Sequence, residues 1–184
     1  MAQEQNKPHV CSTDVFPKKK VISMIKNFHQ LSVEETKSLI RFLSNCPIHG
    51  DVFAEAYHRS EIALHYLAKN ATLTASQISV LVHDDSMRRY TRSEIIDSHF
   101  LLNIARLPNT QQSMLKKIVS LANKFLKNAS NGIAPVFMAV IAHANCTQEI
   151  IGHDIGKKWI VSHGQEPAVA KLLERFEIMS ETTS

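Results

Sequence analysis

An imidazole and a carboxylate stand next to each other at His153 and Asp154, in the run His153-Asp154-Ile155-Gly156-Lys157. Adjacent groups of these two types can help to hold a divalent metal that activates water for phosphoester hydrolysis. That chemistry needs more protein ligands than two, and no aspartate follows Asp154 in the sequence. We therefore assign no metal ligand and no catalytic residue, and we keep metal-dependent hydrolysis as the second alternative for the function.

Cys46, His49 and His58 form another set of residues whose side chains can bind metals. Cysteine and histidine side chains of this kind can bind zinc, but this set lacks a fourth ligand. Pro47 accounts for the local sequence as a turn. We therefore expect Cys46, His49 and His58 to be structural residues.

Basic side chains gather in the middle of the chain, whose formal net charge is +4, and no acidic residue lies between Asp97 and Glu149. Residues at three- and four-residue spacing predict one solvent face of a helix, which we call the basic ridge: Ser113, Lys117, Ser120, Lys124 and Lys127. Such a stripe attracts phosphates or an acidic protein, although it can also be a solvated helix face. We assign partner binding to the basic residues Arg106, Lys116, Lys117, Lys124 and Lys127, and to a second cluster formed by Arg88, Arg89 and Arg92.

Composition limits the class of protein. The chain has 184 residues, 44% of them hydrophobic, and only five glycines, which favours one all-helical domain. The scattered glycines form no phosphate-binding loop, and no Ser-His-Asp or Cys-His set has the context of a nucleophile, so we expect no cofactor and no enzyme. Three widely spaced cysteines without a Cys-x-x-Cys pair indicate free thiols in a reducing cytoplasm. No apolar run is long enough for a signal peptide or a membrane span.

Helices that could position these residues follow from the apolar spacing. Residues 1–20 predict a flexible polar arm, and a first helix begins near Val21. Ser32 and Glu35, like Thr74 and Gln77, have the spacing of capping boxes at helix starts. Pro47 and Gly50 indicate a turn before one long helix over residues 52–67.

Four apolar positions recur in three copies with an offset of 37 residues. The corresponding sets are Leu64, Leu101 and Met138; Leu67, Ile104 and Ile141; Ala68, Ala105 and Ala142; and Leu81, Ile118 and Ile155. Stacked helix pairs need this regularity, because each copy buries the same face against its neighbours. We predict an all-α fold over residues 21–180, either a short right-handed α-solenoid or a helical bundle. It has about three helix pairs, preceded by N-terminal helices and closed by a C-terminal capping helix.

One copy resembles the leucine-rich-variant and HEAT-like helical repeats of bacterial proteins. The residues that carry this resemblance are Leu67-Ala68-Lys69-Asn70, Thr72, Thr74, Ile78, Leu81, Val82, Asp84 and Arg88. The resemblance covers roughly residues 52–163 and is best over 64–88. It implies a curved stack of helices whose surface binds a partner.

The run around His153 is similar to the metal-binding segment of HD-type phosphohydrolases, which are all-helical enzymes. In that family a further histidine lies upstream and an aspartate lies well downstream, and the corresponding stretches here hold Lys124 and no aspartate. The sequence therefore predicts a non-catalytic adaptor that binds another protein, without membrane contact. The first alternative is a nucleic-acid-binding protein that uses the basic face of the middle repeat, and the second is a degenerate HD-type phosphohydrolase.

Overall fold

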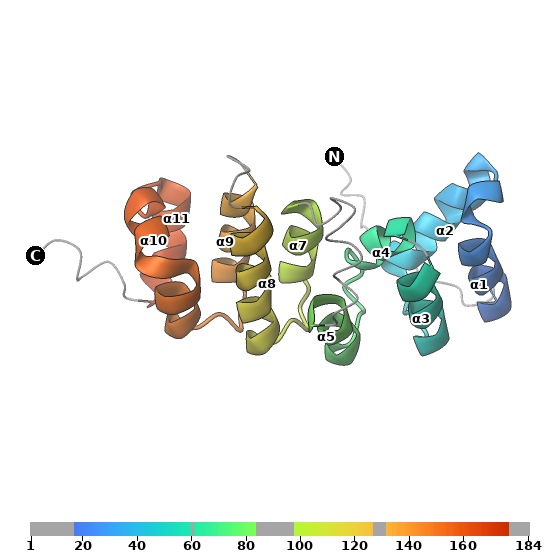
Figure 1. Ribbon diagram of the computed structural model, residues 1–184, viewed down its shortest axis with the longest axis horizontal. Helices are drawn as coiled ribbons and strands as arrows, with labels where there is room; N and C mark the ends of the chain where they lie inside the picture. Colours follow the sequence, from blue (N-terminus) through green and yellow to red (C-terminus); the bar gives the residue numbers. More distant parts are fainter. Residues whose placement is uncertain (1–16, 60, 84–97, 127–131, 177–184) are drawn as a thin grey trace, which may run out of the picture. The chain divides into compact units, whose positions relative to one another are not determined.

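The structure is a computed structural model that describes residues 17–59, 61–83, 98–126 and 132–176. These residues form helices and turns, with no strand among them, so the all-helical prediction is confirmed (Figure 1). The chain divides into two compact units, Met1–Thr72 and Leu73–Ser184. The prediction of a single domain over residues 21–180 stays a prediction.

The first unit contains five described helical segments, namely α1 (Lys18–Lys26), the 3-10 helix η1 (Phe28–Gln30), α2 (Val33–Asn45), α3 (Gly50–Arg59) and α4 (Glu61–Leu67). α1 packs on α3, and α2 packs on α4. The first helix starts directly after Pro17 rather than near Val21. The prediction of one long helix over residues 52–67 is wrong, because α3 and α4 are separate helices that pack on different partners.

Both predicted capping boxes are present. The Ser32 N–H donates to Glu35 Oε2 at 2.9 Å, and the Glu35 N–H donates to Ser32 Oγ at 3.3 Å. The Thr74 N–H donates to Gln77 Oε1 at 2.9 Å, and the Gln77 N–H donates to Thr74 Oγ1 at 3.3 Å. Each box satisfies two backbone N–H groups that a helix start leaves without a partner, and so fixes where α2 and the following α5 begin.

Asn70 connects the end of α4 to the end of α2. Its side chain is fully buried, and Nδ2 donates to the Leu43 carbonyl at 2.7 Å and to the Cys46 carbonyl at 2.8 Å. The Asn70 Oδ1 accepts a hydrogen bond from the Thr72 N–H at 2.9 Å. The amide thus satisfies its own polar atoms and two carbonyls at the C-terminal end of α2.

Replacing Asn70 with alanine should destabilise the first unit strongly. Two buried carbonyls lose a donor in Asn70→Ala, so we expect the free energy of unfolding to fall by about 2–4 kcal/mol, at about 1–2 kcal/mol for each carbonyl. Urea unfolding followed by circular dichroism measures this change. The control is Asn45→Ala, whose exposed amide donates only to Arg41 in its own helix and should cost less than about 1 kcal/mol. Equal losses in both variants would contradict the role given to Asn70.

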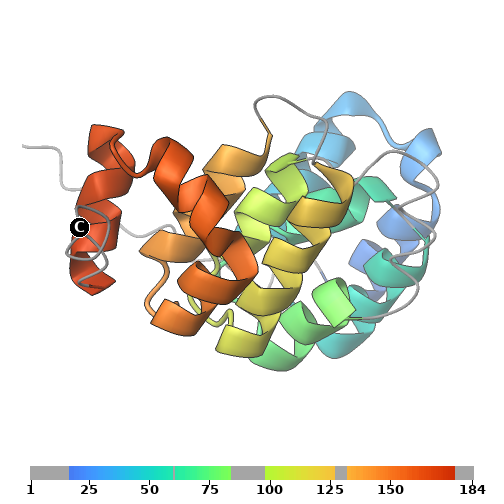
Figure 2. The ribbon, with the colours of Figure 1, turned by 60° about the vertical axis from the view of Figure 1, so that its left-hand side comes forward.

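The second unit contains the remaining described segments, which are α5 (Ala75–His83), α7 (Ser98–Ala105), α8 (Gln112–Phe125), α9 (Ile133–Ala142), the π-helix η2 (Ile150–Gly156), α10 (Lys157–His163), α11 (Pro167–Leu173) and the 3-10 helix η3 (Glu174–Phe176). α8 packs on α5 and on η2, while α9 packs on α7 and on α11. α8 also contacts α7 and α9. The helices of this unit therefore alternate between two layers (Figure 2).

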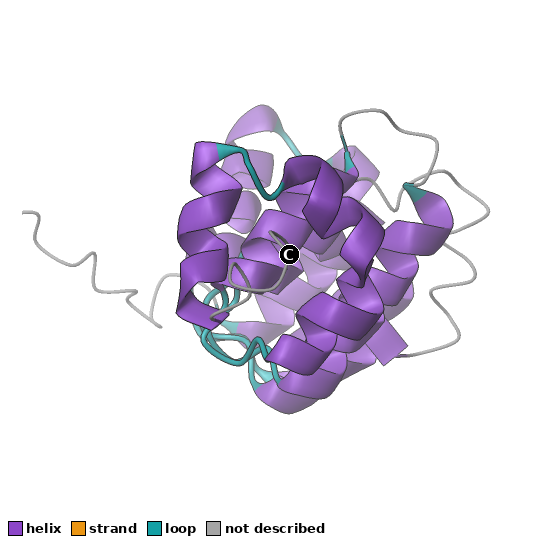
Figure 3. Cartoon of the chain, turned by 90° about the vertical axis from the view of Figure 1, so that its left-hand side faces the viewer, coloured by secondary structure: helices purple, strands orange, loops and turns teal. Residues whose placement is uncertain are grey.

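Side chains in the turns of the second unit bond to the preceding turn. Asn109 Nδ2 donates to the Leu73 carbonyl at 2.7 Å, and Asn145 Nδ2 donates to the Thr110 carbonyl at 2.8 Å. His143 Nε2 lies 3.0 Å from the Leu107 carbonyl. We call the contacts made by Asn109, His143 and Asn145 the turn ladder. Figure 3 shows these turns, in teal, gathered at one end of the helices.

The 37-residue spacing predicts buried positions in the first two copies and fails in part of the third. Leu64 and Leu101 are buried, whereas Met138 is half-buried and Ala142 is exposed. The buried row of α9 is Val136, Phe137, Val140 and Ile141, which lies 36 residues after the buried row of α7, Phe100, Leu101, Ile104 and Ala105. Leu107 and His143 are also 36 residues apart. The prediction that Met138 and Ala142 belong to the core is therefore wrong.

The π-helix η2 carries three buried residues, Ile150, Ile151 and Ile155. Ile151 is buried like Leu115, 36 residues before it, and Ile155 is buried like Val119 and Ile118, 36 and 37 residues before it. A π-helix closes its hydrogen bonds over five residues, one more than an α-helix, so it can take up one extra residue. Ile155 is buried, as the 37-residue spacing predicts.

The cysteines differ from the prediction of three free thiols. Cys46 is disulfide-bonded, so the prediction is wrong for this residue. Cys146 is free and buried. Burial raises the pKa of the Cys146 thiol to about 11, although the positive charge of Arg175 acts in the opposite direction.

Cys146 should react slowly with alkylating reagents in the folded protein. The thiolate is the reactive form, and a thiol with a pKa of about 11 holds very little of it near pH 8. We expect iodoacetamide labelling of Cys146 at pH 8 to be about 100-fold slower than in urea-unfolded protein, as measured by mass spectrometry of the peptide that carries it. Equal rates in the folded and unfolded protein would contradict this environment.

Candidate functional site

Lys116, one of the predicted partner-binding residues, already has a partner. Its Nζ lies 2.5 Å from Glu149 Oε1, and its side chain is 35% exposed. The hydrogen bond and the charge of Lys116 hold the pKa of the Glu149 carboxyl below its usual value. Glu149 is the first acidic residue after Asp97 in the sequence. In the structure it contacts Lys116, which lies within the stretch that has no acidic residue.

The described part of the basic ridge comprises Ser113, Lys117, Ser120 and Lys124 on α8. Lys117 is half-buried, and the other three are exposed. Lys127, and the second cluster of Arg88, Arg89 and Arg92, lie outside the described residues. The predicted ridge is thus described only in part, and its neighbour Lys116 is paired with Glu149.

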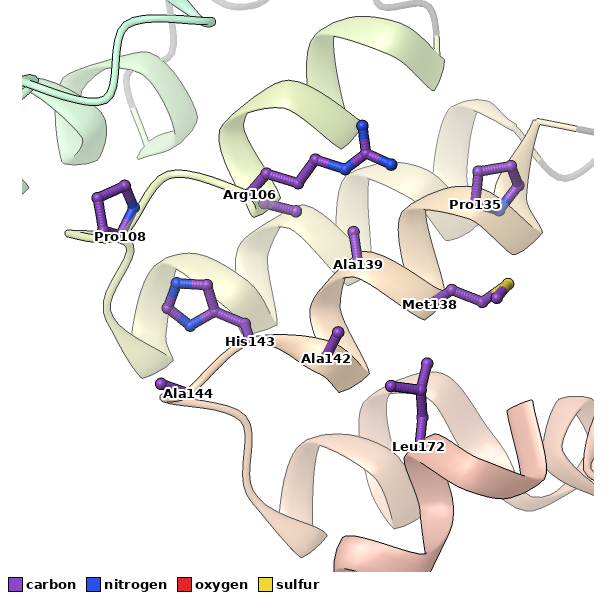
Figure 4. A pocket seen from close by; sticks show the side chains of 10 residues that line it. Arg106, Pro108, Pro135, Met138, Ala139, Ala142, His143, Ala144 and Leu172 are labelled. Carbon is purple, nitrogen blue, oxygen red and sulfur yellow. The ribbon is translucent and has the colours of Figure 1, made fainter. Parts of the chain in front are cut away.

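Arg106, in contrast, lies at a cavity of about 690 Å³ on the layer formed by α7, α9 and α11. Figure 4 shows this cavity, which we call the α9 groove. Its lining residues are Ala105, Arg106, Pro108, Pro135, Met138, Ala139, Ala142, His143, Ala144 and Leu172. No residue of the basic ridge lines the groove, so the structure assigns Arg106 and the α8 lysines to two different places.

The floor of the groove is the outward-facing row of α9, formed by Pro135, Met138, Ala139 and Ala142. These residues follow i, i+3, i+4, i+7 spacing, so they share one helix face. The sequence of α9, IAPVFMAVIA, contains no polar residue. The buried face of α9 is formed by Val136, Phe137, Val140 and Ile141. The opposite face is therefore also apolar, and its residues reach the surface.

The C-terminal end of α9 is held by side chains from elsewhere in the unit. The Arg175 guanidinium donates to the Ala142 carbonyl at 3.3 Å and to the His143 carbonyl at 2.9 Å. His143 Nδ1 accepts a hydrogen bond from the Asn145 N–H at 3.0 Å, which leaves Nε2 as the donor to the Leu107 carbonyl. These bonds satisfy carbonyls at the helix end and fix one end of the groove.

Arg106 is the only charged residue among those that line the groove. Its side chain is exposed and makes no ion pair with the residues that the structure describes. A guanidinium in this state is available to an anionic group from another molecule. The groove therefore combines an apolar floor with one positive group at its edge.

The residues considered for metal chemistry do not come together. The His153 imidazole is 86% exposed, and its Nδ1 lies 3.5 Å from Asp154 Oδ1. His49 Nδ1 lies 3.8 Å from Asp51 Oδ2, and Cys46 is disulfide-bonded. Over residues 17–59, 61–83, 98–126 and 132–176, no three His, Cys, Asp or Glu side chains are grouped so that they could hold a metal ion.

Comparisons of the chain with protein-family models, with curated proteins and with solved structures find no match. The resemblance to leucine-rich-variant and HEAT-like repeats accordingly stays a prediction.

Sequence reasoning found Arg106 but missed the groove beside it. The signal was present in α9, which has no polar residue on any face. A helix of that kind is normally surrounded by other elements, so an outward row that reaches the surface marks a candidate contact site. The assumed 37-residue register concealed this signal, because it placed Met138 and Ala142 in the core.

The pairing of Lys116 with Glu149 should be visible in a carboxyl titration by NMR. We expect the Glu149 pKa to lie below its usual value in the wild type and to rise in Lys116→Met, while Lys117→Met leaves it unchanged. A lowered folded-state pKa means that the pair stabilises the fold above the unfolded-state pKa of Glu149. This stabilisation is lost as the pH falls through the folded-state pKa. Equal shifts in both variants would contradict a specific pair.

Proposed function

We propose that the chain is a non-catalytic binding module that recognises a partner protein on a surface of stacked helices. The second unit supports this proposal, because α9 packs on α7 and α11 while α8 packs on α5 and η2. Stacked helix pairs bury a continuous core and leave an extended surface for a partner. The right-handed α-solenoid and the resemblance to HEAT-like repeats belong to the same proposal.

The outward row of α9 is the observation that carries the proposal. Pro135 and Ala142 are exposed, and Met138 and Ala139 are half-buried, although all four are apolar. Contact of an apolar row with water is unfavourable, so burying the row against another protein lowers the free energy. Catalysis would instead need nucleophiles or acid–base groups at the cavity, and its lining contains only Arg106 and a hydrogen-bonded His143 as titratable groups.

Nucleic-acid binding by the basic ridge is the rival function. The Lys116–Glu149 ion pair neutralises a positive charge next to the ridge. The described cations of the ridge itself are Lys117 and Lys124. Affinity for nucleic acid grows with the number of phosphates that Lys and Arg side chains neutralise. The described surface thus favours a protein partner over a nucleic acid.

A cytoplasmic location belongs to the proposal, and it derives from the sequence. None of the described helices combines the length and the apolar character needed to cross a bilayer. The disulfide at Cys46 removes one of the three free thiols on which the expected reducing compartment was based. Determination of the redox state of Cys46 in freshly lysed native cells would test the location.

Two parallel experiments separate a protein partner from a nucleic acid. We expect cross-linked complexes isolated from native cells to contain a second protein and to survive nuclease treatment. Mobility-shift titrations with DNA and RNA oligonucleotides at low salt should show no retention. Recovery of no protein partner would overturn the proposal. Salt-dependent retention that is lost in Lys117→Glu/Lys124→Glu, but kept in the control Lys158→Glu/Lys171→Glu, would establish the rival function.

A further inference from the structure

The α9 groove has features that specify the kind of partner. Its floor is a helical row of apolar residues, Pro135, Met138, Ala139 and Ala142, and the α11 residue Leu172 forms part of its wall (Figure 4). Arg106 supplies the only charge in its lining. An occupant must therefore cover apolar surface and present a negative group at one position.

We propose that the α9 groove binds an amphipathic α-helix of a partner protein, with apolar side chains against the outward row of α9 and an Asp or Glu side chain paired with Arg106. This inference rests on the proposed function and identifies the surface and the chemistry that carry it out. It involves neither the basic ridge nor the residues outside the described ranges.

A helix fits the floor better than an extended peptide does. The row on α9 forms a ridge at i, i+3, i+4, i+7 spacing, onto which the side chains of a second helix can pack. An extended peptide needs hydrogen-bond partners for its backbone, and the described residues contain no strand edge to supply them. The carbonyls of Ala142 and His143, at the end of the floor, already accept hydrogen bonds from Arg175. A helix satisfies its own backbone groups, so it can lie on an apolar surface without that cost.

The charge of Arg106 selects a carboxylate on the partner. A guanidinium and a carboxylate form two parallel hydrogen bonds, and Arg106 has no carboxylate partner among the described residues. A phosphorylated side chain would place nearly two negative charges against one guanidinium, because both ring nitrogens of His143, the other basic side chain of the lining, are already hydrogen-bonded. A single Asp or Glu at the edge of the apolar face is the matching partner group.

Selection from a displayed peptide library against the full chain tests this inference. The library is an alanine-rich host helix with apolar residues randomised at i, i+3, i+4 and i+7 and with Glu, Gln or Lys at one flanking position. We expect the wild-type chain to enrich Glu over Gln and Lys by about tenfold or more. Arg106→Glu should reverse this preference toward Lys, because the charge at the edge of the groove is reversed.

Steric variants test the floor of the groove independently of the charge. Ala139→Trp should abolish binding of the enriched peptides, and the matched control Ser120→Trp, on the exposed face of α8, should leave it unchanged. Circular dichroism and thermal unfolding establish that each variant is folded. If Arg106→Glu fails to fold, Arg106→Gln takes its place and should remove the Glu preference without reversing it.

The possible outcomes separate this inference from the proposed function. Absence of enrichment, an unchanged Glu preference in the Arg106 variant, or binding that survives Ala139→Trp would overturn the groove assignment. In each of these cases, a protein partner recovered from cells would leave the proposed function standing. If cells yield no protein partner, the proposed function fails, and the inference that rests on it fails with it.

Discussion

Buried backbone carbonyls in the turns need hydrogen-bond donors, and the position of α9 depends on which side chains supply them. The His143 imidazole donates to the Leu107 carbonyl, and the Asn145 side-chain amide donates to the Thr110 carbonyl. These bonds set the turn after α9 in a 36-residue register with the turn after α7. In that register the inner row of α9, from Val136 to Ile141, enters the core. The residues on its other face then form the floor of the α9 groove.

A π-helix, η2, follows the turn after α9. It runs from Ile150 to Gly156 and buries Ile150, Ile151 and Ile155. A π-helix closes its hydrogen bonds over one residue more than an α-helix does. The apparent metal motif at His153 and Asp154 lies on this helix. Packing accounts for Ile155 in this run, whereas the His153 imidazole is directed to solvent.

The two basic features of the second unit have different surroundings. On α8, Glu149 from the next copy pairs with Lys116 and lowers the positive charge beside the ridge. At the end of α7, Arg106 lies against the apolar floor of α9 and has no described acidic partner. An isolated guanidinium beside apolar surface recognises one carboxylate on an apolar helix, whereas a solvated lysine stripe attracts anions of many kinds. The groove is for this reason the more selective of the two surfaces.

The sequence alone determined the helical class, the capping boxes at Ser32 and Thr74, and the burial of Leu64, Leu67, Leu101 and Ile104. The capping boxes depend on residues three positions apart, and the burial of the four apolar residues follows from their recurrence at a 37-residue spacing, so the sequence pattern is sufficient to predict both. Tertiary structure decided the partial exposure of Met138 and the exposure of Ala142, the division between α3 and α4, the disulfide at Cys46 and the pairing of Lys116 with Glu149. The exposure of Met138 and Ala142 and the Lys116–Glu149 pair arise where side chains from different copies meet, 33 to 36 residues apart in the chain. A shift of one residue between copies rotates a helix by about 100°. The spacing within one copy carries no information about that rotation.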